Sequence, residues 1–185
     1  CTMTSPIDFL LSRQSNGNLT EPAPNKGELE QILQSAMSVP DHAGLTPWRI
    51  TVVEGDARQT LANAYVASVK AGGADEAKLA KAERMPFRAP LLVIVSTSYQ
   101  EHPKVPKIEQ SIAAGCAVHA MQMAAVALGF NAMWRTGDLA FCDVVKQHLA
   151  IETENDIVGY LYIGTEARTL PNKPRKSFSE VTRYL

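Results

Sequence analysis

The sequence predicts one domain in which helices and strands are interleaved. The chain has 185 residues, a length that fits one domain with a full-sized hydrophobic core. Hydrophobic residues make up 45% of it and charged residues 20%, which are ordinary values for a globular protein. Helical periodicity and short β-branched runs both occur, and neither an internal repeat nor a composition shift divides them. We therefore expect a single domain over residues 1–185.

The first third of the chain contains two helical patterns and one strand pattern. A short helix is expected over residues 5–13, and a second over 27–37, where apolar residues recur at helical spacing. Residues 20–26 contain two prolines and form a connector, and 41–47 form a loop by composition. Residues 48–54 are β-branched and aromatic and are bounded by proline and glycine, which predicts a strand.

The middle of the chain predicts two helices followed by a fully buried strand. Residues 57–70 are helical by periodicity, and the pair Gly72-Gly73 breaks the pattern. A helix restarts over 75–84, with Asp75 as a plausible N-cap. Residues 91–97 form a continuous apolar run, which is typical of a strand covered on both faces.

The last third predicts a long helix and two strands. Residues 104–109 are polar and lead into a helix over 112–128. A short strand is expected over 131–136, an amphipathic helix over 138–149, and a strand over 158–163 closed by Gly164. The long helix is rich in alanine on several faces, which suits either a central core helix or a helix shared at a dimer interface.

The C-terminal tail differs from the rest of the chain. Residues 166–176 are polar and aperiodic, whereas 177–185 end in β-prone residues. The tip could add as a strand to the sheet edge of a second subunit, or it could be a frayed terminus.

Charge and cysteine content exclude several classes of protein. The net charge is −1, so no strong field favours nucleic acid or an anionic membrane. The three cysteines, Cys1, Cys116 and Cys142, include no CxxC pair, which argues against a disulfide framework or a zinc site. No signal peptide is visible, and the weakly polar run 112–130 fits a buried helix better than a membrane span. We expect a cytoplasmic protein with no nucleic-acid or membrane partner.

Common catalytic motifs are missing from the sequence. It holds no GxGxxG after a strand, no Walker A motif, no GxSxG elbow and no HExxH spacing. His119 and Met123 lie one turn apart on the apolar helix, where core positions are the favoured interpretation. Cys116 is expected to be a small buried hydrophobe.

Polar and basic residues gather instead at the ends of predicted elements. They are Arg13-Gln14-Ser15, Asp41-His42, Trp134-Arg135-Thr136 and Lys173-Pro174-Arg175. A phosphorylated aromatic cofactor such as FMN needs this mix, because its phosphate favours Arg or Lys and its ring favours apolar walls with a few donors. Taken singly, Arg13, Lys173 and Arg175 fit solvated surface charges better.

Taken together and in this order, these segments resemble the nitroreductase family, most closely its minimal single-domain, YdjA-like bacterial subgroup. The resemblance covers nearly the whole chain. Its most specific stretches are Glu21-Pro22-Ala23-Pro24, Ala36-Met37-Ser38-Val39-Pro40-Asp41-His42 and Thr46-Pro47-Trp48. The others are Pro86-Phe87-Arg88-Ala89-Pro90, His102-Pro103-Lys104-Val105-Pro106, Ala114-Gly115-Cys116-Ala117-Val118, Met121-Gln122-Met123-Ala124-Ala125-Val126-Ala127, Trp134-Arg135-Thr136-Gly137 and Ile157-Val158-Gly159-Tyr160-Leu161-Tyr162-Ile163-Gly164-Thr165.

The resemblance implies an α+β, nitroreductase-like fold with a central, mostly antiparallel sheet wrapped by helices. It implies a homodimer with FMN at the subunit interface and a C-terminal strand exchanged onto the partner subunit. NAD(P)H is the implied electron donor, and a small molecule such as a nitroaromatic or a quinone is the implied acceptor, in a ping-pong reaction that needs no catalytic protein residue.

The resemblance also assigns the cofactor contacts. Arg13, Gln14 and Ser15 correspond to the family's Arg-Arg-Ser element, with Gln14 in place of the second arginine. The family motif continues with another arginine, where Asn16-Gly17-Asn18 stands here. Ser38 and His42 match positions near the flavin of the partner subunit.

Three further segments are matched. Trp134, Arg135 and Thr136 correspond to a Trp-Arg-Ser element beside the flavin. Our hypothesis is that Arg135 or a nearby backbone donor stabilises charge at the pyrimidine end of the flavin ring. Lys173 and Arg175 resemble a C-terminal phosphate clamp. A nicotinamide-nucleotide segment is matched by Ala124, Ala125, Val126, Ala127, Leu128 and Gly129, whose apolar character suits the core equally well.

Two other functions remain open. The protein could bind FMN as a carrier or sensor with little turnover, or it could be a related flavoenzyme with dehalogenase-type or oxidase-type chemistry.

Overall fold

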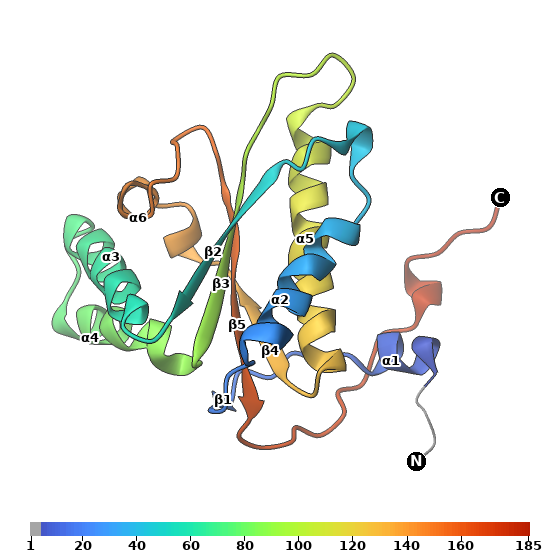
Figure 1. The fold of residues 1–185 in the computed structure, drawn as a ribbon, viewed down its shortest axis with the longest axis horizontal. Helices are drawn as coiled ribbons and strands as arrows, with labels where there is room; N and C mark the ends of the chain where they lie inside the picture. The colour runs from blue at the N-terminus through green and yellow to red at the C-terminus, as the bar shows by residue number, and fades with distance from the viewer. Residues whose placement is uncertain (1–4) are drawn as a thin grey trace.

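A five-stranded sheet lies at the centre of the computed structural model, which describes residues 5–185 (Figure 1). Strand β5 (Ile157–Glu166) is its middle strand and pairs with β3 (Leu91–Thr97) along one edge. Along its other edge β5 pairs with β4 (Asn131–Arg135) and β1 (Leu19–Thr20). Strand β2 (Trp48–Glu54) pairs with β3 and forms an outer edge. Each of these pairings is antiparallel, as the expected fold class requires.

Helices cover both faces of the sheet. Helices α2 (Lys26–Ser35) and α5 (Lys107–Ala127) pack on one face, and α3 (Ala57–Ala71), α4 (Glu76–Arg84) and α6 (Asp143–His148) lie on the other (Figure 1). Alternate side chains of β3 explain the division, because successive strand residues point to opposite faces. Its odd-numbered residues join the α5 core and its even-numbered ones join the α3 core. All seven residues of β3 are buried, as predicted.

The long helix begins earlier than the hydrophobic pattern indicates. It starts at Lys107 rather than Ile112, because its first turn is polar and mostly exposed. Gln110 is the exception, since it is buried and its amide donates to Gln100 O at 2.9 Å and to Val105 O at 3.1 Å. A buried glutamine anchors this turn, and a search for apolar periodicity cannot detect it.

Two other boundaries differ by three residues or more from those predicted. The expected helix over 138–149 is a 3₁₀ turn, Asp138–Ala140, followed by the shorter α6, with Cys142 as its N-cap. Strand β5 continues through Gly164 to Glu166 instead of ending there. At Gly164 a Cβ would lie 2.8 Å from Pro90 Cδ and 3.0 Å from Thr20 O. The glycine therefore admits β1 and the neighbouring loop close to the strand, and does not end it.

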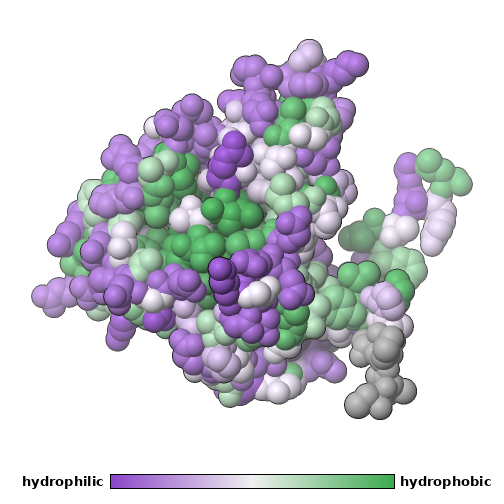
Figure 2. Space-filling model, in the orientation of Figure 1, coloured by the Kyte–Doolittle hydropathy of each residue, from purple (hydrophilic) through white to green (hydrophobic). Residues whose placement is uncertain are grey.

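Helix α1 (Pro6–Ser12) and the C-terminal tail project from the body beyond α5 (Figure 1). Figure 2 shows hydrophobic side chains on both of these projecting segments. Within residues 5–185 no strand follows Glu166, and the tail holds one 3₁₀ turn, Phe178–Glu180. The described helices include none that is long and apolar enough to span a bilayer. Of the three cysteines, Cys1 lies outside the described residues.

Candidate functional site

A surface cleft of about 510 Å³ brings together four of the predicted cofactor residues. Arg13 and Ser15 come from the segment after α1, and Trp134 and Thr136 come from the end of β4. His119 and Gln122 of α5 complete the lining. Three segments that are far apart in the sequence thus meet at one place, which offers a cation, hydroxyl groups, an amide and an aromatic ring.

The segment after α1 is fixed by a buried asparagine. Asn16 is fully buried and donates to Glu166 Oε1 at 3.0 Å and to Arg168 O at 2.8 Å. Its Oδ1 accepts the backbone N–H of Asn18 at 2.9 Å. These bonds attach residues 13–18 to the end of β5, so Arg13 and Ser15 are held at the cleft. The departure of Asn16-Gly17-Asn18 from the family pattern therefore has a structural role.

Trp134 lies across β5 because Gly159 leaves room for its indole ring. The Trp134 Nε1–H donates to Val158 O at 3.2 Å. A Cβ built on Gly159 would lie 2.0 Å from Trp134 Nε1, whereas one on Gly115 would lie 3.7 Å from Trp134 Cη2. The ring therefore fills the space over Gly159 and lines the cleft.

Ser15 and Gln122 form the polar wall of the cleft. Arg13 Nη1 donates to Ser15 Oγ at 3.2 Å, and Gln122 Nε2 donates to the same oxygen at 3.3 Å. Gln122 is only 3% exposed and also donates to Ala132 O of β4 at 3.2 Å. This amide joins α5, β4 and the segment after α1.

Arg135 points away from this cleft. Successive residues of a strand face opposite sides, so Arg135 lies on the other face from Trp134. Its guanidinium carbon lies 5.4 Å from the centre of the Tyr162 ring, and its buried Nε–H has no hydrogen-bond partner among residues 5–185. A Cβ on Gly17 would lie 2.8 Å from Arg135 Nη2. The side chain is thus covered by Gly17 and does not line the cleft.

Gln14 holds the C-terminal tail. Its Nε2 donates to Pro171 O at 2.9 Å, and its Oε1 accepts the backbone N–H of Lys173 at 3.1 Å. Arg175 Nη2 donates to Arg13 O. Gln14, Lys173 and Arg175 line a separate depression of about 370 Å³. Gln14 therefore uses both a donor and an acceptor here, and an arginine has no acceptor to offer.

Ser38 and His42 do not line the cleft in this chain. Both are exposed, and Ser38 Oγ donates to Ser35 O at 2.8 Å, while His42 Nδ1 lies 2.7 Å from Glu109 Oε2. Between them, Val39 and Pro40 line an apolar groove of about 530 Å³ along α5. That groove shares His119 and Trp134 with the cleft.

The segment 124–129 forms the last turn of α5 and the loop after it. Ala125 is buried in the α5 core, and Ala124 and Leu128 pack against that core. None of the six residues is among those that line the clefts described above. Core packing is therefore the role that the structure shows for Ala124, Ala125 and Leu128, whereas Ala127 and Gly129 are exposed.

Two residues of the cleft lining, His119 and Gln122, were not predicted as site residues. His119, for which a core position was favoured, is exposed and faces the cleft, so that interpretation was wrong. Met123 is buried, as expected, whereas Cys116 is half-buried and lines the apolar groove. Helix α5 carries alanine on most of its faces, so its periodicity gave no sign of which side is open.

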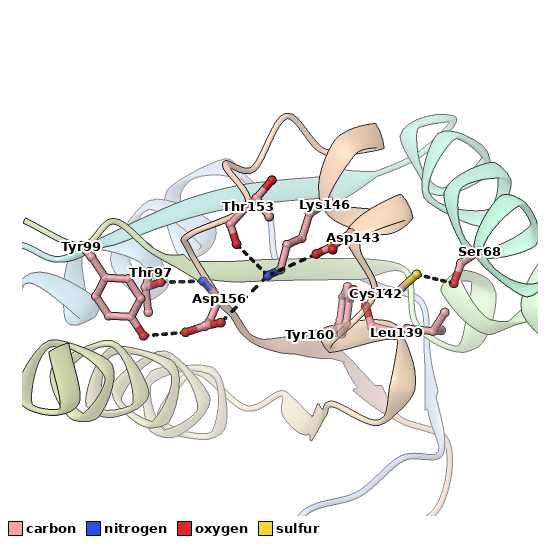
Figure 3. A network of polar contacts seen from close by, with 10 residues as sticks. All are labelled: Ser68, Thr97, Tyr99, Leu139, Cys142, Asp143, Lys146, Thr153, Asp156 and Tyr160. Atoms are coloured by element: carbon pink, nitrogen blue, oxygen red, sulfur yellow. Dashed lines mark hydrogen bonds and ion pairs between the residues drawn. The ribbon is translucent and has the colours of Figure 1, made fainter. Parts of the chain in front are cut away.

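A second polar network lies near α6 (Figure 3). The buried Lys146 Nζ lies 3.8 Å from Asp143 Oδ1 and 4.0 Å from Asp156 Oδ1, and it donates to Thr153 O at 3.3 Å. Tyr99 Oη donates to Asp156 Oδ2 at 2.6 Å. The network ties α6 to the start of β5. Residues 5–185 contain no cluster of three or more His, Cys, Asp or Glu that could hold a metal ion.

Comparison with known proteins assigns the chain to a family. The model of the Nitroreductase family matches residues 10–165, and the chain belongs to this family. It is 42% identical over 171 residues to the protein named "Putative NAD(P)H nitroreductase YdjA" from Escherichia coli K12, an alignment that covers 91% of this chain and 93% of the relative.

Solved structures share the fold at low sequence identity. A nitroreductase-like family protein from Bacillus cereus superimposes with a TM-score of 0.86 at 23% identity, covering 100% of this chain and 98% of the other. A variant of the FMN and NADPH-dependent nitroreductase NfnB from a Sphingopyxis strain superimposes with a TM-score of 0.77 at 18% identity, covering 97% and 98%.

Proposed function

We propose that this protein is an FMN-dependent oxidoreductase that transfers two electrons from NAD(P)H to a small acceptor such as a nitroaromatic or a quinone. The observation that carries the proposal is the cleft in which Arg13, Ser15, Trp134 and Thr136 meet. The relative from Escherichia coli is named as an NAD(P)H nitroreductase, and NfnB as FMN and NADPH-dependent.

The lining residues fit FMN chemically. Arg13 offers a guanidinium to a phosphate, and Ser15 and Thr136 offer hydroxyl groups to the ribityl chain or the phosphate. Trp134 offers an apolar wall to a flat ring. FMN would supply the redox chemistry when bound, so the protein needs to bind, orient and shield it. Lys173 and Arg175 are proposed to add positive charge from the tail.

The proposed active form is a homodimer in which each chain completes the partner's site. In residues 5–185 the apolar groove along α5 is open, and Ile112 on its edge is 59% exposed. Helix α1 and the tail add further exposed apolar side chains, namely Ile7, Leu10, Leu11, Phe178, Val181, Tyr184 and Leu185. Soluble monomers rarely expose so many large apolar groups together.

A partner subunit would explain three features at once. It would cover the apolar groove, bring Ser38 and His42 to the flavin of the other chain, and receive the tail as an exchanged strand. We further propose that residues 1–185 act as one domain and that the protein works in the cytoplasm. Arg135 keeps a proposed role through its backbone, because its side chain faces Tyr162.

The proposal is tested by measuring flavin content and reduction. Purified protein should be yellow and release FMN on denaturation, and stopped-flow mixing with NADH and NADPH should bleach the flavin rapidly. Flavin that stays oxidised with both donors would favour a carrier or sensor, and colourless protein that takes up no added FMN would overturn the proposal.

A variant of Arg13 tests the site itself. Arg13→Ala should weaken FMN binding by about 10-fold or more, because a charge-assisted hydrogen bond contributes about 1.5–3 kcal/mol. Fluorescence titration of the apoprotein measures this affinity. Arg84→Ala, on the exposed end of α4, is the matched control and should bind FMN like the wild type.

A further inference from the structure

We propose that Gln122 is a positioning residue of the FMN site, which makes the Ser15 hydroxyl a directed hydrogen-bond donor toward the bound cofactor. This inference rests on the proposed function. It assigns a role to a buried side chain for which the sequence predicted none.

The orientation of the Gln122 amide is fixed by its surroundings. Its Nε2 lies 3.2 Å from Ala132 O, and a backbone carbonyl can only accept a hydrogen bond. The nitrogen, rather than the oxygen, must therefore face β4. The same nitrogen lies 3.3 Å from Ser15 Oγ, so its second N–H is directed to the serine.

Ser15 Oγ then receives two donors that cannot reverse their roles. Arg13 Nη1 lies 3.2 Å away, and a guanidinium has no acceptor. A hydroxyl oxygen has two lone pairs and one proton, so both lone pairs are engaged. Its proton has no acceptor among residues 5–185 in the hydrogen bonds of this structure. Because Ser15 lines the cleft, that proton is available to a ligand.

The ligand atom opposite Ser15 must accordingly be an acceptor. A phosphate oxygen and a carbonyl oxygen of the flavin ring both meet this requirement, whereas a ring N–H does not. Gln122 is 3% exposed and held at two points, so its amide stays in place while ligands exchange. The polarity of the wall is thus set before the cofactor binds, which lowers the ordering cost of binding.

Gln122→Glu reverses this polarity with almost no change in shape. A carboxylate only accepts hydrogen bonds, so it would accept one from the Ser15 hydroxyl and turn that O–H away from the ligand. A protonated carboxyl keeps one donor and restores part of the original arrangement. Gln122→Met removes the hydrogen bonds while keeping the length and burial of the side chain.

The experiment measures the FMN dissociation constant of apoprotein by fluorescence titration for the wild type and for Gln122→Glu, Gln122→Met and Ser15→Ala. We expect Gln122→Glu to weaken FMN binding by about 10-fold at about pH 8, and the loss to shrink toward about pH 5 as the new carboxyl is protonated. The loss in Gln122→Met should not change with pH beyond the change of the wild type.

A double-mutant cycle tests whether Gln122 acts through Ser15. In the Ser15→Ala background, Gln122→Glu and Gln122→Met should each cost at least threefold less in affinity than in the wild type. Titration with riboflavin, which lacks the phosphate, separates the two acceptors. If the acceptor is the phosphate, Gln122→Glu and the wild type should bind riboflavin with equal affinity. If the acceptor is a carbonyl oxygen of the flavin ring, Gln122→Glu should bind riboflavin more weakly than the wild type does.

Three results would overturn the inference: wild-type affinity in Gln122→Glu, a loss that is independent of pH, or full additivity with Ser15→Ala. If Gln122→Glu does not fold, as judged by circular dichroism, the cycle with Gln122→Met decides alone. Wild-type protein that binds no FMN would instead refute the proposed function, so the two failures are distinguishable.

Discussion

Trp134 shows how two glycines determine the position of one side chain at the cleft. Gly159 on β5 leaves the space that the indole ring occupies, and Gly115 on α5 allows the helix to approach its far edge. The two sites differ sharply in their tolerance of a methyl group, because the nearest ring atoms are at 2.0 Å and 3.7 Å from the respective Cβ positions.

Gly159→Ala should therefore displace the Trp134 ring. A contact of 2.0 Å is far below van der Waals separation, so either the ring or β5 must move. We expect the free energy of unfolding to fall by about 1–3 kcal/mol, as for other overpacked cores, and FMN affinity to fall with it. Urea unfolding and fluorescence titration measure the two effects.

The matched variant is Gly115→Ala, which places its methyl group at ordinary contact distance from the same ring. It should leave the unfolding free energy unchanged or raise it slightly, since alanine is favoured over glycine in a helix. Equal destabilisation by the two variants would refute this account of how Trp134 is positioned.

At the scale of elements, β5 carries a different chemistry on each face. Toward α5 it presents Leu161 and Ile163, and toward α3 it presents Tyr160 and Tyr162. The Tyr160 ring meets Tyr65 of α3 edge to face, with centroids 5.5 Å apart. Burial raises the pKa of Tyr65 far above its ordinary 10.0, with Tyr162 and Tyr160 adding to the shift, and burial also raises the pKa of Tyr160.

These shifts predict that the protein loses stability in alkali. Above about pH 10 the phenols of the unfolded chain ionise while the buried ones keep their protons, so the unfolded state binds fewer protons. The free energy of unfolding must then fall with rising pH, by about 1.4 kcal/mol per pH unit for each such tyrosine. Below pH 10 this contribution is fully present.

Tyr65→Phe isolates one member of this cluster. The Tyr65 hydroxyl is buried beside Tyr160 and Tyr162 and has no hydrogen bond of normal geometry among the described residues, so its removal should leave the unfolding free energy at neutral pH unchanged or raise it by up to about 1 kcal/mol. Above pH 10 the unfolding free energy should fall less steeply with pH in this variant, by about 1.4 kcal/mol per pH unit, because one tyrosine fewer ionises on unfolding. Urea unfolding at a series of pH values measures both, with the exposed Tyr184→Phe as control. An unchanged alkaline slope would contradict the assignment.

The elements were predictable where apolar pattern and boundary residues agree. Strands β2 and β3 have the predicted bounds, because proline, glycine and β-branched residues frame them. The start of α5 and the split before α6 were missed, since a buried glutamine fixes the first and a short 3₁₀ turn precedes the second. Strand β1 was also missed, because two residues carry no periodic pattern.

At the scale of the whole molecule, the apolar surface along α5 gives the sharpest test of assembly. Ile112→Glu should convert the proposed dimer to a monomer, because it places a charge in a groove that a partner would dehydrate. The isolated fold should survive, since this side chain is 59% exposed. Size-exclusion chromatography with light scattering measures the mass, and FMN affinity should fall in parallel.

Phe141→Glu is the control, because Phe141 is also strongly exposed but lies on the α6 side of the sheet. It should leave both the mass and the FMN affinity unchanged. Wild-type mass for Ile112→Glu would show that the dimer, if present, uses another surface.

The candidate site was only partly readable in the sequence. Arg13, Ser15, Trp134 and Thr136 were predicted and do line one cleft, because they belong to short motifs at the ends of elements. The contacts of Gln14 with the tail were not predictable, since they depend on residues more than 150 positions away. Gln122 and His119 were hidden by the uniform apolar character of α5. Strand alternation places the Arg135 side chain on the opposite face.

The central position of β5 has a consequence for synthesis of the protein on the ribosome. Strands β1, β3 and β4 all pair with β5, which follows each of them in the chain. Only the β2–β3 pair can form before Ile157 has been made and has left the exit tunnel. The Arg13 segment must likewise wait for Glu166 and Arg168, to which Asn16 is bonded. A nascent chain therefore carries Arg13 and Ser15, the first candidate cofactor residues, without the rest of the cleft until residue 168 has left the exit tunnel.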